Sequence, residues 1–190
     1  MFTKTLFAAA LAVLAAPAAA FAHAELSPTV GLKGHTALYT LAVPTEKDNA
    51  ETTQIELRPP AGFAIDSFVP SPGWKRVMQQ TGSGEEAVIT KVTWSGGKVP
   101  TGEDAAFSFL AAPSDAKTYT FGVRQTYSDG SVVDWNGPES SDTPSPTVII
   151  RSSLGGGASS TLAVVALAVG AVGVLLGGLA LVAGGRRPLA

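Results

Sequence analysis

Residues 162–182 form an uninterrupted apolar run without a charged or strongly polar side chain. About twenty apolar residues, at roughly 1.5 Å of rise each, cross the hydrocarbon core of a bilayer as a helix. Arg186 and Arg187 follow this run, and cations beside a span favour the cytoplasmic side of the membrane. We therefore expect a transmembrane helix at 162–182, a short cytoplasmic tail at 183–190, and an extracytoplasmic chain before the helix.

The N-terminus resembles a secretory signal peptide. Residues 1–22 contain one cation, a long alanine-rich apolar stretch, and the small residues Ala20 and Ala22 at the end. Cleavage after Ala22 makes His23 the first residue of the mature chain. The bond after Ala24 satisfies the same rule of small residues, and cleavage there removes the histidine. The sequence alone does not decide which of these two bonds is cleaved.

Between these ends lies one domain, residues 23–151, followed by a linker at 152–161 that is rich in glycine and serine. From residue 23 to residue 153 the chain has ten basic and fifteen acidic side chains, a net charge of about −5. Phosphate recognition needs a basic face, so nucleic acid is not an expected partner. The chain has no cysteine, which excludes disulfides and thiolate chemistry.

The domain shows the two-residue alternation of β-strands. The clearest segments are residues 36–43, 52–58, 87–94 and 118–127, and weaker ones are 63–69, 74–80, 105–110 and 147–151. We expect residues 95–97 to end the third segment, residues 128–130 to form a hairpin turn, and Glu56 to face solvent. The pattern indicates an all-β fold, an antiparallel sandwich.

Sequence signatures of enzymes are missing. The chain contains no GxSxG, no HExxH and no phosphate-binding glycine loop. We therefore expect a binding protein rather than an enzyme.

His23 has metal-binding chemistry of its own if cleavage follows Ala22. The new α-amine and the imidazole nitrogen nearer the backbone can close one chelate ring, which is half of a histidine brace. Nitrogen ligands of this kind favour Cu(II) among the divalent first-row ions. The amine must lose its proton, at a reference pKa of about 7.7 to 8.0, so metal affinity should fall in acid.

Six short motifs follow one another in a characteristic order. They are HAELSP at 23–28, VPTE at 43–46, PSPGW at 70–74, VTWSGG at 92–97, QTYSDGSVVDW at 125–135 and SPTV at 145–148. In this order they resemble the YcnI-like copper-binding domain family across the whole domain. The resemblance implies an immunoglobulin-like β-sandwich that holds Cu(II) by a brace with one histidine. It also implies a membrane-anchored metallochaperone or copper-homeostasis factor, with a copper-transport or copper-acceptor membrane protein as a partner.

The resemblance also implies a set of site residues: His23, Glu46 of VPTE and Trp135 of VVDW. Glu51 and Asp134 are the substitutes if Glu46 is not the carboxylate ligand. The indole nitrogen of Trp135 is a donor without a lone pair, so its role would be ring packing or a hydrogen bond to a ligating atom. His35 precedes a strand, and we expect it at the surface.

Two other interpretations fit part of the sequence. A CopC-like periplasmic copper carrier also begins with such a terminus. In CopC-like domains the residue after the Asp-Gly pair is often histidine, whereas here Ser131 follows Asp129-Gly130. The other is a surface adhesion module that binds no metal. Blocking the amine of His23 should leave the function of such a module intact.

Overall fold

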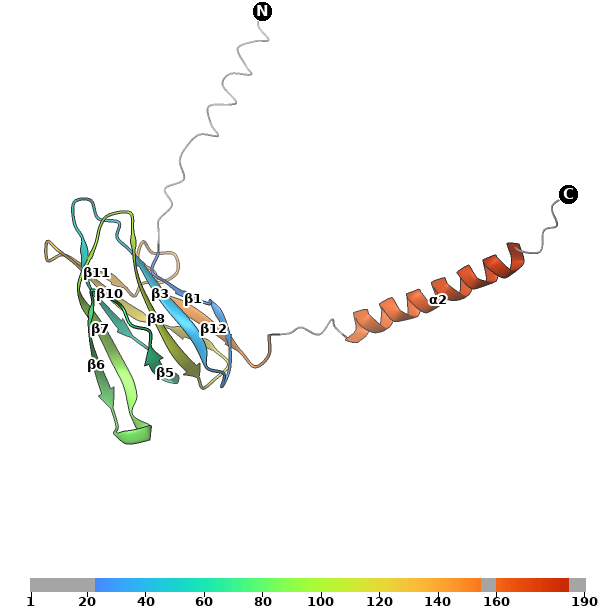
Figure 1. The fold of residues 1–190 in the computed structure, drawn as a ribbon, viewed down its shortest axis with the longest axis horizontal. Helices are drawn as coiled ribbons and strands as arrows, with labels where there is room; N and C mark the ends of the chain where they lie inside the picture. The colour runs from blue at the N-terminus through green and yellow to red at the C-terminus, as the bar shows by residue number, and fades with distance from the viewer. Residues whose placement is uncertain (1–22, 155–159, 185–190) are drawn as a thin grey trace, which may run out of the picture. The chain divides into compact units, whose positions relative to one another are not determined.

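The computed structural model describes residues 23–154 and 160–184, and the expected signal peptide and residues 185–190 of the expected tail lie outside this part of the chain. The chain divides into two compact units, one ending at Ser153 and one beginning at Leu154. The first is the expected β domain, and the second contains one helix (Figure 1).

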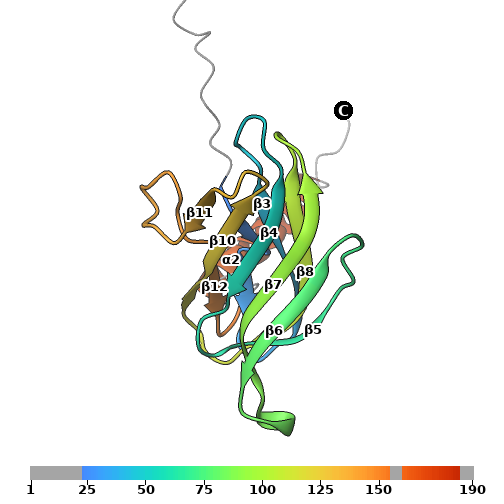
Figure 2. The same ribbon diagram turned by 90° about the vertical axis from the view of Figure 1, so that its left-hand side faces the viewer.

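The β domain contains three sheets (Figures 1 and 2). In spatial order, the first sheet consists of β1 (Glu25–Ser27), β3 (Ala37–Pro44), β8 (Asp104–Pro113) and β5 (Phe63–Phe68). The second consists of β11 (Val132–Trp135), β10 (Gly122–Tyr127), β4 (Thr52–Arg58), β7 (Val88–Val99) and β6 (Lys75–Thr81). The third consists of β2 (Val30–Leu32), β12 (Thr147–Arg151) and β9 (Thr118–Thr120). Among these pairs only β2 and β12 run parallel, so the expected antiparallel sandwich is confirmed.

The core lies between the two larger sheets, where the inward faces of their strands meet. Tyr39, Leu41 and Val43 of β3 are fully buried, as the alternation in this segment predicts. Across the sandwich, the rings of Trp94 on β7 and Phe107 on β8 stack with centroids 4.3 Å apart. Burying each large apolar side chain contributes roughly 1.5–3 kcal/mol, so this layer supplies the main stabilisation of the domain.

The expected end of the third segment at residues 95–97 is wrong, because β7 continues to Val99. Gly96 has a φ of 91°, and the register with β4 shifts at this point, so the two glycines form a bulge rather than a turn. Gly97 is buried under the ring of Trp74, and a Cβ at Gly97 would collide with that ring. Gly97 therefore serves close packing, and Gly96 supplies the positive φ of the bulge.

The expected exposure of Glu56 is also wrong. Its side chain lies on the outer face of β4, yet the residue is only 8% exposed. The Arg58 guanidinium pairs with one carboxylate oxygen, and the Lys91 ammonium lies 3.1 Å from the other. Lys91 comes from β7, so a neighbouring strand supplies part of the cover.

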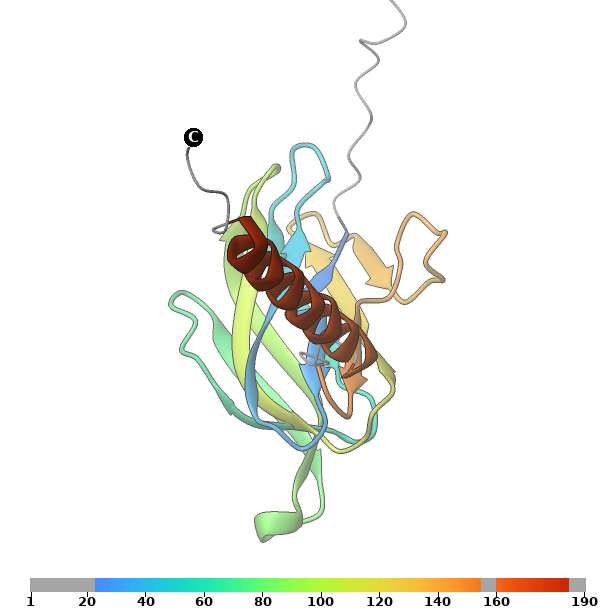
Figure 3. The ribbon, with the colours of Figure 1, turned by 90° about the vertical axis from the view of Figure 1, so that its right-hand side faces the viewer.

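The first two strands, β1 and β2, belong to different sheets. β1 pairs with β3, and after two intervening residues β2 pairs with β12, so the start of the domain is bonded on two sides. The second unit is the helix α2 (Ser160–Gly184), unbroken over its whole length (Figure 3). Residues 162–180 have a mean hydropathy of 2.5, long and apolar enough to cross a membrane. A helix therefore covers the expected segment.

Candidate functional site

Strand pairing fixes the position of the first described residues. β1 pairs antiparallel with β3, and Leu26 lies opposite Leu41. Ala24 is 3% exposed and belongs to the core, so the alternation continues before the strand begins. Continued to residue 23, this register places His23 beside Pro44 at the end of β3. An amine created by the expected cleavage before His23 would therefore lie at this end of the sandwich.

Glu46 lies two residues beyond Pro44, and its side chain is exposed. The ladder between β3 and β8 extends past Pro44, because the Thr45 N–H donates to the Glu103 carbonyl at 2.9 Å. Opposed residues of an antiparallel pair share a face, and every second residue returns to that face. Both residues lie outside the paired strands, and continuing the register to them places His23 and Glu46 on the same face.

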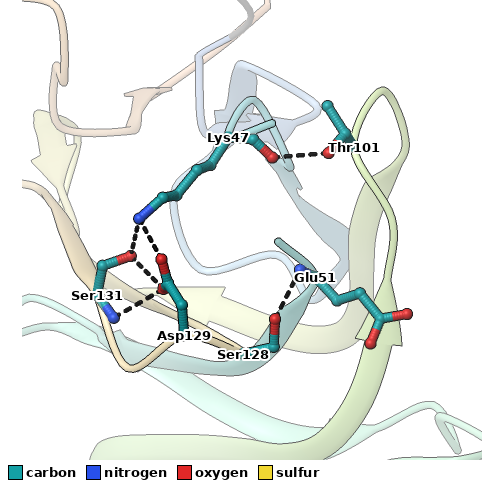
Figure 4. Close-up of polar contacts among 6 residues, drawn as sticks. All are labelled: Lys47, Glu51, Thr101, Ser128, Asp129 and Ser131. Carbon is teal, nitrogen blue, oxygen red and sulfur yellow. Dashed lines mark hydrogen bonds and ion pairs between the residues drawn. The ribbon is translucent and has the colours of Figure 1, made fainter. Parts of the chain in front are cut away.

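The segment that follows Glu46 is held by two turns from other parts of the chain (Figure 4). The Lys47 ammonium donates to Asp129 and, at 2.7 Å, to the hydroxyl of Ser131, both in the β10–β11 turn. The Lys47 carbonyl accepts a hydrogen bond from Thr101 at 2.6 Å. The Lys47 ammonium, followed by the Ser131 donors, holds the pKa of the Asp129 carboxyl well below its usual range. The loop carrying Glu46 is thus clamped on both sides.

Tyr127 contacts the same loop at Lys47 and at the Glu46 backbone. The residue is 3% exposed, and its ring centroid lies 5.9 Å from the Lys47 ammonium. Burial raises the pKa of the Tyr127 hydroxyl, which also makes a hydrogen bond to the Glu46 backbone.

The two substitute carboxylates have different surroundings. The Glu51 N–H donates to the hydroxyl of Ser128 at 3.1 Å, and its carboxylate points away from Lys47 (Figure 4). Asp134 lies 3.6 Å from the Arg124 guanidinium on the outer face of the second sheet. Asp134 therefore faces away from the core.

Trp135 occupies an edge strand, yet its side chain is buried at 1% exposure. Its indole N–H donates to the side-chain oxygen of Gln125 at 3.0 Å. The Gln125 amide in turn donates to the Pro44 carbonyl at 2.8 Å and to the Thr52 hydroxyl at 2.7 Å. Thr52 is paired with the Thr45 hydroxyl at 2.7 Å. The indole of Trp135 is therefore bonded to Gln125 and reaches the end of β3 through it.

Two hollows open near these residues. One is an open cleft of about 750 Å³, which His23 shares with the carboxylate residues Glu25 and Glu139. Its far wall is the loop between β11 and β12. The other, of about 320 Å³, is lined by Glu46 together with Glu103 and others. His23 and Glu46 thus share a face by register but line separate hollows.

His35 is exposed, as expected, and precedes the first residue of β3. His23 lies by register at the last residue of the same strand. Eight residues of strand span about 23 Å, so the two imidazoles cannot meet on one ion. Within residues 23–154 and 160–184, no group of three or more His, Asp or Glu side chains is arranged to hold a metal ion.

Comparison with known proteins identifies the family. Residues 23–150 match the family described as "Domain of unknown function (DUF1775)". The chain belongs to the DUF1775 family. This match begins at His23 and confirms the resemblance to YcnI-like domains.

Two relatives of this DUF1775 chain are informative. It is 34% identical over 138 residues to the copper-binding protein CutI of Bacillus subtilis (strain 168). The match covers 71% of this chain and spans 65% of the length of that relative. An uncharacterized protein from Nocardia farcinica with an immunoglobulin-like fold is 27% identical, with a TM-score of 0.57. That match covers 68% of this chain and 98% of the solved one, which confirms the immunoglobulin-like fold.

Sequence reasoning missed two residues near the candidate site. The alternation in residues 118–127 places Gln125 on the face of Tyr119, Phe121 and Tyr127, and a glutamine among aromatic residues is itself a signal. Glu139 carried no signal, because the fold of its loop brings it to the cleft of His23.

Proposed function

We propose that this protein binds Cu(II) outside the cytoplasm through a brace with one histidine. Signal-peptide cleavage after Ala22 exposes the amine of His23, and amine and imidazole chelate the ion. Glu46 supplies a carboxylate oxygen from the neighbouring loop. The observation that carries the proposal is the 34% identity to a copper-binding protein, within a family match that starts at His23.

The register of β1 supports this arrangement, because its continuation beyond the paired residues leads to His23 beside Pro44 and on the face of Glu46. The role of the protein is then to carry or buffer copper without catalysis. α2 anchors the domain to the membrane, where a copper-transport or copper-acceptor membrane protein can exchange the ion with it.

Two proteins test the brace. Residues 23–153 form a unit with its own core, so this part is prepared with His23 as its first residue. A matched protein carries one additional alanine before His23, which keeps the imidazole but moves the amine away. Both are titrated with Cu(II), and electron paramagnetic resonance spectra are recorded.

The proposal predicts that the extended protein binds Cu(II) more weakly, with a changed hyperfine coupling, because the chelate ring is lost. Equal affinity with the same spectrum would show that the amine is not a ligand and would reject the brace. Failure of both proteins to bind Cu(II) would reject the copper function itself.

A further inference from the structure

A hydrogen-bond network of buried polar side chains joins the two larger sheets near the end of β3. It consists of Trp135, Gln125 and Thr52 from the second sheet, and Thr45 with the Pro44 carbonyl from the first. Gln125 and Thr52 are 0% exposed, and Thr45 is 1% exposed. These three residues and Glu56 are the buried polar residues of the part of the chain that the structure describes. The other buried side chains of the domain are aliphatic or aromatic.

Gln125 is the centre of this network, because both the oxygen and the nitrogen of its side-chain amide make hydrogen bonds. Its oxygen accepts from the Trp135 indole, and its nitrogen donates once to Pro44 and once to Thr52. An unpaired buried amide costs several kcal/mol in an apolar interior, whereas a fully satisfied network rigidifies the groups that it joins. The amide therefore fixes the relative position of the two sheets at this end.

The bond to Pro44 has a specific consequence for the site. Pro44 is the residue that lies beside His23 by register and two residues before Glu46. Pro44 is therefore the residue of β3 that is nearest, by register or in the sequence, to each proposed ligand. Proline has no N–H, and its carbonyl is bonded from the opposite sheet by Gln125.

We propose that Gln125 is a positioning residue for the copper site, and that it holds the end of β3 in the geometry that brings Glu46 to the His23 chelate. The inference rests on the function proposed above and extends it to a residue that does not touch the ion. Trp135 acts through Gln125, because its indole N–H orients the amide. Partners of this kind affect metal affinity about 10- to 100-fold in other metal sites.

The test uses the ectodomain that begins at His23. Gln125→Met keeps the size of the side chain but removes all three hydrogen bonds. Gln125→Glu keeps the acceptor for Trp135 but removes the N–H donors to Pro44 and Thr52. Ile65→Ala is the control, because Ile65 is a core residue of β5, at the other edge of the first sheet. Each variant is measured for Cu(II) affinity, electron paramagnetic resonance and thermal unfolding.

We expect both Gln125 variants to bind Cu(II) about 10- to 100-fold more weakly, with a changed spectrum. Ile65→Ala should unfold at a lower temperature and keep the affinity and spectrum of the wild type. Normal affinity and an unchanged spectrum in Gln125→Met would overturn the inference.

Thr52→Val provides a second variant if Gln125→Met does not fold. It removes the hydroxyl that joins Gln125 to Thr45 while keeping the shape of the side chain, and it should weaken Cu(II) binding in the same direction. An unchanged spectrum there would also overturn the inference. Wild-type protein that binds no Cu(II) would instead reject the proposed function, so the two failures are distinguishable.

Discussion

At the scale of single residues, two carboxylates, Glu46 and Glu139, are related to His23 in different ways. Glu46 shares a face with His23 by register, whereas Glu139 shares a cleft with it. Both side chains are exposed, so replacing either carboxylate by an amide should change the free energy of unfolding by about 0.5 kcal/mol or less. This makes the two substitutions a matched pair.

We predict that Glu46→Gln weakens Cu(II) binding at least about tenfold and that Glu139→Gln leaves it unchanged, because only Glu46 is proposed as a ligand. Titration of both variants with Cu(II) checks this. The opposite pattern would assign the ligand to the loop between β11 and β12 and contradict the role of Glu46.

The clamp on the Glu46 loop predicts a pH dependence. The pKa of Asp129 is lower in the folded state than its ordinary value of 3.8. The clamp therefore contributes its full stability above about pH 3.8, and loses it as the pH falls through the lowered folded value. A carboxyl titration by NMR should give Asp129 a pKa below 3.8, and Lys47→Met should raise it. An Asp129 titration that is unaffected by Lys47→Met would show that the clamp does not exist in solution.

Several residues could not be assigned from the sequence, because their contacts are distant along the chain. Glu56 alternates outward as predicted, but Lys91 of another strand helps to cover it. Glu139 reaches the cleft of His23 only through the fold of its loop. By contrast, the inward position of Gln125 follows from local alternation alone, and only its bonding partners required the structure.

At the scale of elements, the long strands were predictable and the short ones were not. β3, β4 and β10 carry several alternating pairs, and their inward faces are the predicted ones. β1, β2 and β11 have three or four residues each, too few for a period to show. Yet β1 positions His23, so the most important placement in the site depended on pairing rather than on local pattern.

β7 also provides a prediction at this scale, since Gly97 is explained by its packing against Trp74. Gly97→Ala should destabilise the domain by about 1–3 kcal/mol, because the new Cβ collides with the Trp74 ring. Gly122→Ala is the matched strand control, since its Cβ would lie 3.8 Å from the nearest atom, an ordinary contact. Urea unfolding measures both. Equal stability of the two variants would contradict the packing explanation of the bulge.

At the scale of the whole molecule, the proposed function needs a processed N-terminus, a β domain and a membrane helix. The domain and the helix are separate compact units, and residues 152–159 lie between β12 and α2 in the sequence. The fold of each unit could be predicted from the pattern of apolar residues. The cleavage site could not, because two adjacent bonds satisfy the same requirement for small side chains.

The most direct test of the proposed copper site is the mass of the mature N-terminal peptide, measured on the native protein isolated from its own membranes. The proposal predicts a chain that begins at His23, with a free amine beside the imidazole. A chain that begins at Glu25 would have a free amine without an imidazole beside it, and would contradict the proposed copper site.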